Sequence, residues 1–286
     1  MRIAIVSNVV PFLYGGAEFL ADSLQKKLQE YGHETEQVLF PFSWKDNKEI
    51  LDNIMAVRLA KLENTDLAIA LKFPAFYIQH PNKKLWLLHQ FRQVYDLYGT
   101  EYSSFDDENQ EDFMLKQTVT NLDNTILGAL EGRIFTNSKV VSDRLMMFNS
   151  IPSQVLFPPL MDASLYHITG EYGDYIFYPS RVNLTKRQHL AVEAMRFTKS
   201  KVKLVLAGKG DALEDEQRIF KLIEKYNLRD KVEYINRFIT EEEKVELFEK
   251  SLAGIYIPYD EDSYGYVTLE GFQAGKERNT CRDAGG

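Results

Sequence analysis

Two cationic side chains, Arg181 and Lys186, lie in a short loop after the apolar run Asp174–Pro179 and before the helix-like run His189–Phe197. A guanidinium binds two phosphate oxygens at once, and an ammonium adds a second positive charge. At the start of a helix the pair could therefore neutralise a diphosphate. A solvated loop that contains Lys and Arg gives the same spacing, so both interpretations stay open.

An acidic cluster, Asp260-Glu261-Asp262, ends the apolar run Gly254–Ile257, and Glu270 lies in the helix-like run Tyr266–Ala274. Asp-x-Asp could hold a divalent cation through hard oxygen ligands. Alternatively, Asp262 accepts hydrogen bonds from a sugar without a metal, or the cluster is a solvated charge run. Carboxylates before and inside a helix start would place hydroxyl acceptors beside an anion site.

Glycines follow two of the expected strands. Gly15-Gly16 separates the β-branched run Arg2–Ser7 from the helix-like run Ala17–Tyr31, and Gly208-Lys209-Gly210 follows the apolar run Val202–Ala207. Glycine lets a ligand approach the backbone where helix N–H groups point outward, but it serves a tight turn equally well. Gly-x-Gly alone is a weak signal for a nucleotide.

A histidine, His89, ends the strand-like run Lys84–Leu88. Ligands of doubly wound sheets bind at the carboxyl ends of strands, and imidazole titrates near neutral pH. His89 is therefore a candidate for catalysis, although a lone histidine is more often structural. Four residues after it could line an acceptor site or could be helix surface and core: Gln90, Arg92, Tyr95 and Tyr98.

Strand-like and helix-like runs alternate along the chain, which predicts an α/β protein with doubly wound parallel sheets. Loop-type composition before Gly173 predicts two Rossmann-like domains facing a cleft, 1–165 and 174–286. Thr240 to Glu243 has the pattern of a capping box. The further expected strands are 36–40, 67–71, 133–137, 155–161 and 232–235, and the further helices are 112–130, 138–148, 212–226 and 241–251.

The totals limit the function classes. The 286 residues suit two domains, and 44% hydrophobic content suits full cores. A net charge of −8 argues against nucleic acid or an anionic membrane as main partner. The single cysteine, Cys281, excludes an internal disulfide. With no apolar run near the ~20 residues of a membrane span and no signal peptide pattern, we expect a cytoplasmic protein.

The order of these features resembles that of the family 4 retaining glycosyltransferases of the GT-B fold. The resemblance covers nearly the whole chain, and the ordered combination is more specific than any single motif. It implies a hexosyltransferase-type enzyme with a nucleotide-diphosphate sugar as donor, and no metal or other cofactor. The features that carry it are Gly15-Gly16-Ala17-Glu18, His89, Arg181 with Lys186, Gly208-Lys209-Gly210 and Asp262-x7-Glu270.

The resemblance also implies roles for single residues. Arg181 and Lys186 would grip the donor diphosphate, and Glu270 would bind the ribose hydroxyls. Asp262 would face the donor sugar, and His89 would line the sugar site. The other residues expected at the donor are Gly15, Gly16, Gly208, Ser263, Tyr264, Gly265 and Tyr266.

The chain departs from the family pattern in two places. Asp262 stands where the family has Glu, which is one methylene longer. After Lys276 the family continues with proline and an apolar strand, whereas Glu277-Arg278-Asn279 is charged and polar. The pattern resumes at Thr280–Gly286. We therefore expect a second domain that lacks its last strands and a helix, about 60 to 100 residues, and has reduced stability.

The resemblance implies a glycan or lipid-linked acceptor in the synthesis of a surface glycan. Lipid-linked acceptors would allow loose peripheral attachment to a membrane. Two other functions use the same donor: a nucleotide-sugar epimerase, and a catalytically dead protein that only binds the sugar nucleotide. A metal-dependent Asp-x-Asp enzyme is a minor further alternative. Product analysis separates transferred sugar, isomerised donor and merely bound donor.

Overall fold

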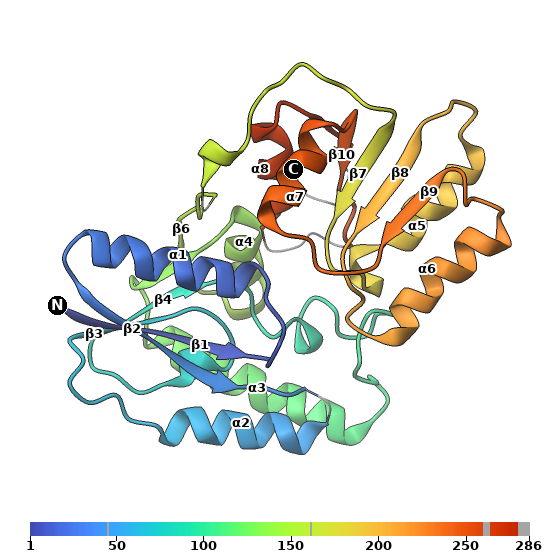
Figure 1. Cartoon of the computed structure of the whole chain (residues 1–286). Helices are drawn as coiled ribbons and strands as arrows, with labels where there is room; N and C mark the ends of the chain where they lie inside the picture. The colour runs from blue at the N-terminus through green and yellow to red at the C-terminus, as the bar shows by residue number, and fades with distance from the viewer. Residues whose placement is uncertain (45, 161, 260–263, 280–286) are drawn as a thin grey trace. The chain divides into compact units, whose positions relative to one another are not determined.

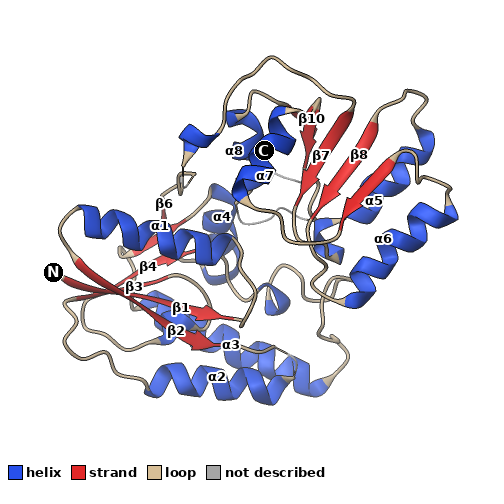
Figure 2. Cartoon of the chain, in the orientation of Figure 1, coloured by secondary structure: helices blue, strands red, loops and turns tan. Residues whose placement is uncertain are grey.

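A computed structural model describes residues 1–44, 46–160, 162–259 and 264–279 of the chain. The chain divides into two compact units, Met1–Met161 and Asp162–Gly286. Each unit has its own parallel sheet covered by helices (Figure 1, Figure 2). The predicted α/β class with parallel sheets is confirmed. Asp262, Ser263 and the segment Thr280–Gly286 lie outside the described residues.

The first unit contains a six-stranded sheet in the order β2-β1-β3-β4-β5-β6, and every described pair of strands is parallel. Its strands are β1 (Arg2–Val9), β2 (Glu34–Pro41), β3 (Leu67–Ala70), β4 (Lys83–Leu87), β5 (Ile134–Thr136) and β6 (Gln154–Val155). Its α-helices are α1 (Gly16–Glu30), α2 (Asn47–Leu59), α3 (Gln110–Gly128) and α4 (Lys139–Asn149), with short 3-10 turns η1 (Ala75–Tyr77) and η2 (Arg92–Val94).

Apolar side chains at helical spacing hold this sheet between two layers. On one face, Leu20 and Ala21 of α1 pack with Ile5 and Trp86 of the strands. On the other face, the larger core joins the strands to α2 and α3 (Figure 2). A buried strand contributes side chains to both layers because successive side chains alternate between the two faces.

The second unit contains a five-stranded parallel sheet in the order β11-β10-β7-β8-β9. Its strands are β7 (Tyr175–Pro179), β8 (Lys203–Ala207), β9 (Val232–Ile235), β10 (Ala253–Ile255) and β11 (Glu277–Asn279). Its α-helices are α5 (Gln188–Ala194), α6 (Leu213–Lys225), α7 (Glu241–Glu249) and α8 (Tyr266–Gln273), with 3-10 turns η3 (Ala163–Leu165), η4 (Leu184–Lys186) and η5 (Met195–Phe197).

Two cores cover this second sheet. One core packs Val192 of α5 and Ile219 of α6 against the strands. The other packs Phe248 of α7 and Tyr166 of the segment before β7 against Phe177. Phe177 and Phe248 meet edge to face with ring centroids 4.9 Å apart.

Each sheet has a point where the strand order reverses. In the first unit β2 lies on one side of β1 and β3 on the other. In the second unit β8 lies on one side of β7 and β10 on the other. The loops that leave neighbouring strands diverge there, so these are the places where an α/β sheet binds ligands.

Three local expectations need correction. The strand expected at 155–161 is only β6, because Pro158 and Pro159 lack the N–H that a sheet ladder requires. The capping box at α7 is half formed: Thr240 accepts from the Glu243 backbone N–H, but the Glu243 carboxylate pairs with Arg237 instead. The polar run 277–279 nevertheless pairs with β10 as strand β11.

No helix within the described ranges has both the length and the apolar character needed to cross a membrane.

Candidate functional site

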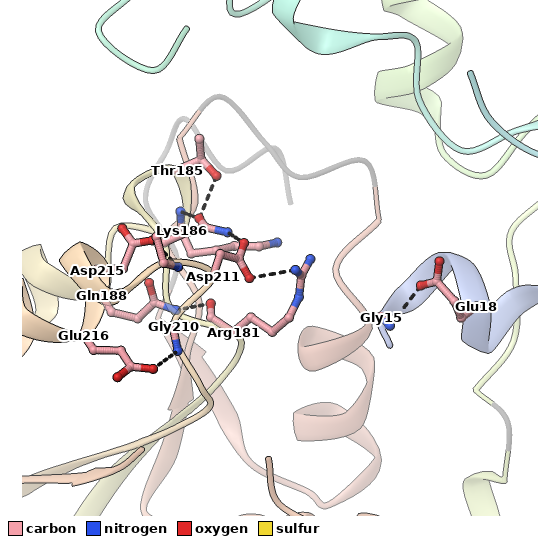
Figure 3. A network of polar contacts seen from close by, with 12 residues as sticks. Gly15, Glu18, Arg181, Thr185, Lys186, Gln188, Gly210, Asp211, Asp215 and Glu216 are labelled. Carbon is pink, nitrogen blue, oxygen red and sulfur yellow. Dashed lines mark hydrogen bonds and ion pairs between the residues drawn. The ribbon is translucent and has the colours of Figure 1, made fainter. Parts of the chain in front are cut away.

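Three loops of the second unit leave the carboxyl ends of the neighbouring strands β8, β7 and β10. The loop after β7 carries Arg181 and Lys186, the loop after β8 carries Gly208, and the segment after β10 leads to α8 and Glu270. Because the strands are parallel, these loops meet at one edge of the sheet. Figure 3 shows the first two loops from close by.

Arg181 is held by a carboxylate of the loop after β8. Its Nη1 donates to Asp211 Oδ1 at 2.7 Å, and its backbone carbonyl accepts from Gln188 Nε2 at 2.8 Å (Figure 3). Within the part of the chain that the structure describes, the guanidinium has no other hydrogen-bond partner. The Nε and Nη2 edge thus remains available for a two-point contact with a phosphate.

Lys186 ends the 3-10 turn η4 and extends from the loop in the same direction as Arg181 (Figure 3). Its Nζ donates to the hydroxyl of Tyr256, which follows β10, at 2.6 Å. The hydroxyl of Tyr178, buried in β7, donates to the Lys186 carbonyl and accepts from the Ile257 backbone at 3.2 Å. Lys186 therefore spans the point where the strand order reverses.

The turn at Gly208 has a steric requirement for glycine. Its φ is +153°, and a Cβ built there would lie 2.0 Å from the carbonyl oxygen of Ser180. The Gly208 N–H donates to the Ile235 carbonyl at 3.1 Å, so it is used within the fold. Gly208 thereby brings the β8 loop against the β7 loop, and its predicted contact with a donor stays a prediction.

Glu270 of α8 is buried and paired with a lysine. Lys244 of α7 donates to Oε1 at 2.7 Å, whereas the buried Oε2 has no hydrogen-bond partner within the described residues. Burial raises the pKa of Glu270, and the charge of Lys244 opposes that rise. Burial alone would lower the pKa of Lys244, but Glu270 and Glu241 outweigh it and raise that pKa. Buried acceptors are nearly always paired, so Oε2 is an exception among the described carboxylate oxygens.

The described residues just before Glu270 are fixed locally. The Tyr266 N–H donates to the Tyr264 carbonyl at 3.1 Å, and the two rings meet at 85° with centroids 5.1 Å apart. Gly265 precedes the first residue of α8, and a Cβ there would lie 2.8 Å from Thr268 Oγ1. The predicted contacts of Tyr264, Gly265 and Tyr266 with a donor remain predictions, and Asp262 and Ser263 lie outside the described residues.

In the first unit the glycine pair is closed by a carboxylate. Glu18 Oε2 accepts from the Gly15 N–H at 3.0 Å, and Glu18 Oε1 accepts from Lys72, which follows β3, at 3.0 Å. Gly16 is the first residue of α1. The start of α1 therefore already holds an anion, the side chain of Glu18.

His89 lies two residues beyond the end of β4, and its Nδ1 is 2.7 Å from the carbonyl oxygen of Gln90. The imidazole is half-buried. Of the residues weighed for an acceptor site, Gln90 is buried against Asn149, and Tyr95 donates to the buried Asp123 at 2.7 Å. Both therefore belong to the interior.

The structure thus brings together the loops of Arg181, Lys186 and Gly208, and places Glu270 after the adjacent strand β10. Gly15, Gly16 and His89 belong to the first unit. The sequence alone did not identify the partners Asp211, Asn183, Tyr256 and Lys244. Asp211 had a usable signal, since it follows the Gly-Lys-Gly turn directly.

Among the described residues there is no group of three or more His, Cys, Asp or Glu side chains placed to bind a metal ion. The acidic cluster 260–262 is outside these residues, so its three interpretations remain open.

Residues 169–277 match the family model described as Glycosyl transferases group 1. These residues run from the segment before β7 to β11, so they include the site loops. None of the curated proteins compared with the chain matches it.

Solved glycosyltransferase structures share the fold. HepE of Anabaena in complex with UDP and glucose is 13% identical, with a TM-score of 0.68 over 97% of this chain and 80% of that chain. A glycosyltransferase from Rickettsia africae is 16% identical, with a TM-score of 0.67 over 100% and 80%. The trehalose-6-phosphate synthase OtsA is 13% identical, with a TM-score of 0.66 over 100% and 85%.

The chain therefore has the α/β fold class of the GT-B glycosyltransferases, and the matched second unit supports a glycosyltransferase. Family 4 in particular, and a truncated second domain, stay predictions.

Proposed function

We propose that this chain transfers a sugar from a nucleotide-diphosphate sugar to a hydroxyl acceptor, with retention of configuration and without a metal ion. The single observation that supports it best is the edge of the second sheet. There Arg181 and Lys186 follow β7, and the helix after the neighbouring strand β10 carries a buried carboxylate, Glu270, one of whose oxygens has no hydrogen-bond partner among the described residues. The same residues lie within the glycosyltransferase family match.

In this proposal Arg181 and Lys186 bind the diphosphate, and Glu270 accepts a hydrogen bond from a ribose hydroxyl. As the glycosidic bond breaks, negative charge grows on the leaving diphosphate. The two cations stabilise that charge where it develops, which lowers the barrier. The acceptor hydroxyl attacks the same face of the sugar, and the leaving phosphate takes its proton. His89 and Asp262 keep their proposed places at the sugar.

HepE binds UDP, UDP-glucose and glucose in its solved complexes, as their names state. A uridine-diphosphate sugar is therefore the first donor to try. The acceptor proposed is a glycan or lipid-linked intermediate of surface-glycan synthesis, in the cytoplasm.

A thermal-shift screen against nucleotide-diphosphate sugars, with and without EDTA, tests the binding step. A donor at about 100 times its Kd stabilises the native state by about 2.7 kcal/mol. We expect one donor to raise the Tm in EDTA, and an Arg181→Ala, Lys186→Ala double variant to lose that rise. Lys203→Ala with Arg229→Ala is the control, because it removes two exposed cations of the same unit.

Product analysis with the stabilising donor then tests the chemistry. A transferred sugar with retained configuration supports the proposal, and an isomerised donor supports the epimerase. Donor binding without any product supports a sugar-nucleotide-binding protein. A Tm shift that disappears in EDTA contradicts the metal-free mechanism.

A further inference from the structure

One carboxylate, Asp211, joins Arg181 and Lys186, the two cationic residues proposed to bind the diphosphate. Asp211 Oδ1 accepts from Arg181 Nη1 at 2.7 Å, and Oδ2 accepts from Asn183 Nδ2 at 2.8 Å (Figure 3). Asn183 Oδ1 in turn accepts from the Lys186 backbone N–H at 2.9 Å and from the Thr185 hydroxyl at 2.8 Å. Arg181 and the backbone of Lys186 are therefore parts of one hydrogen-bonded chain.

The backbone on both sides of this chain is fixed as well. The Val182 N–H donates to the Lys209 carbonyl at 2.9 Å, and the Asp211 N–H donates to the Val182 carbonyl at 2.9 Å. Gly208 makes the close approach of the two loops sterically allowed. Because of these bonds, the backbone of Asp211 cannot shift without moving both the loop after β7 and the loop after β8.

The position of Asp211 is unexpected for a site that receives a diphosphate, because a carboxylate repels the phosphates. Its Coulomb effect weakens ground-state binding, whereas its hydrogen bond fixes the guanidinium by one nitrogen. Because Arg181 is already fixed, it can present its Nε and Nη2 edge to a phosphate and lose little further rotamer freedom on binding. Such an arrangement favours rate over affinity, since charge stabilisation counts most where the charge develops.

We propose that Asp211 is a positioning residue for sugar transfer: it holds Arg181 directly, and Lys186 through Asn183, in the geometry that stabilises the leaving diphosphate. This inference rests on the proposed function and deepens it. Asp211 touches neither the sugar nor the acceptor in this proposal, and it acts only through the cations that it holds.

Steady-state kinetics of Asp211→Asn with the donor found by the thermal-shift screen test the inference. We expect kcat to fall about tenfold while the donor KM does not rise. Calorimetric titration with UDP should show binding no weaker than that of the native chain. A purely structural role would weaken binding and turnover together.

Asp215→Asn is the matched control. It removes the same charge four residues away, where the carboxylate accepts from the Ala212 backbone and does not contact Arg181 (Figure 3). Its kcat and KM should stay within about twofold of the native values. Thermal unfolding of both variants checks that each is folded.

A double-mutant cycle gives the decisive comparison. In an Arg181→Ala background, Asp211→Asn should lower kcat by clearly less than in the native background, because only the indirect effect on Lys186 through Asn183 remains. An equal loss of kcat in both backgrounds, or a tenfold rise in donor KM with unchanged kcat, overturns the inference and leaves the proposed function standing. A native chain that neither binds nor turns over any donor overturns both.

Discussion

Each unit contains a lysine–glutamate pair whose carboxylate lies in the first two turns of a helix, but the two pairs differ in how they are satisfied. In the first unit, Lys72 and the Gly15 N–H occupy both oxygens of Glu18. In the second unit, Lys244 occupies one oxygen of Glu270, and the other is buried with no hydrogen-bond partner among the described residues. A fully paired carboxylate stabilises a helix start, whereas a half-paired buried one costs free energy until something binds.

The difference shows that equal topology does not give equal chemistry. Both sheets are parallel and both reverse their strand order once. Among the described residues, the buried carboxylate oxygen without a hydrogen-bond partner belongs to the second unit, where Arg181 follows the strand at which the order reverses. The identity and pairing of a few side chains, and not the fold, decide which edge binds a ligand.

The largest expected effect comes from breaking the more buried pair. Lys244→Met leaves the Glu270 carboxylate buried without a counter-charge, so we expect a loss of about 3 to 5 kcal/mol in the free energy of unfolding. Urea denaturation followed by circular dichroism measures it. Lys72→Met is the counterpart in the first unit, where Glu18 is more exposed and retains the Gly15 bond. A loss there as large as for Lys244→Met would contradict the comparison.

A third carboxylate extends the comparison to pH. Asp123 is fully buried and accepts from Tyr77 and Tyr95, both at 2.7 Å, with no cation among its hydrogen-bond partners in the described chain. Burial raises its pKa to about 7, against the opposing effect of the two tyrosine hydrogen bonds. Between about pH 4 and pH 7, Asp123 therefore keeps a proton in the folded state that it has already released in the unfolded state.

The sign of the pH effect follows from that proton. Protonated Asp123 stabilises the folded state by up to about 4 kcal/mol, and this contribution is complete below the unfolded pKa near 4. The contribution is lost as pH rises through the folded pKa of about 7. Asp123→Asn cannot release a proton, so its unfolding free energy should lack this decline. Urea denaturation of both proteins from pH 4 to pH 8 checks it. Parallel curves would show that Asp123 is ionised throughout.

The close approach at Gly208 gives the third prediction. Gly208→Ala places a Cβ against the Ser180 carbonyl, so we expect a loss of about 3 kcal/mol, confined to the second unit. The control is Gly128→Ala in α3, where a Cβ would meet no atom within 4 Å. Alanine is the better helix former, so this control should be neutral or stabilising by up to about 1 kcal/mol. Limited proteolysis identifies the unit that opens.

The smallest expected changes separate the two carboxylates by function. Glu270→Gln should weaken UDP binding about tenfold to hundredfold, because a hydrogen bond to a charged acceptor contributes roughly 1.5 to 3 kcal/mol. Glu18→Gln should cost about 1 kcal/mol of stability through the helix start and leave UDP binding unchanged. Calorimetric titration and thermal unfolding measure the two effects. Reversed outcomes would assign the ligand-binding carboxylate to the first unit.

Much of the fold follows from the sequence, because buried parallel strands and amphipathic helices have different periodicities. The β-branched run at the N-terminus became β1, and the glycine-led apolar run after it became α1. Boundaries were less predictable where two local effects compete. Prolines shortened the strand expected at 155–161, and Arg237 took the carboxylate that a capping box would have used.

The site was predictable only in part. Its loops could be found, because strand ends followed by Arg181 and Lys186 carry a local signal. Their partners could not, since the bonds join residues that are far apart in the sequence: 30 positions for Asp211 with Arg181, and 70 for Tyr256 with Lys186. Such pairings arise from the strand order, which periodicity does not specify.

The strand order also has a consequence for how the protein is made. β7 is the first strand of the second sheet, but its neighbour β10 emerges from the ribosome more than seventy residues later. During synthesis the loop of Lys186 therefore waits beside an empty strand position, and Tyr256 reaches it only when β10 docks. Contacts of such long sequence separation are slow to form, because the entropy lost on closing the intervening loop must be offset first. The hydrogen bond that holds the Lys186 ammonium therefore forms only after most of the second unit has been synthesised.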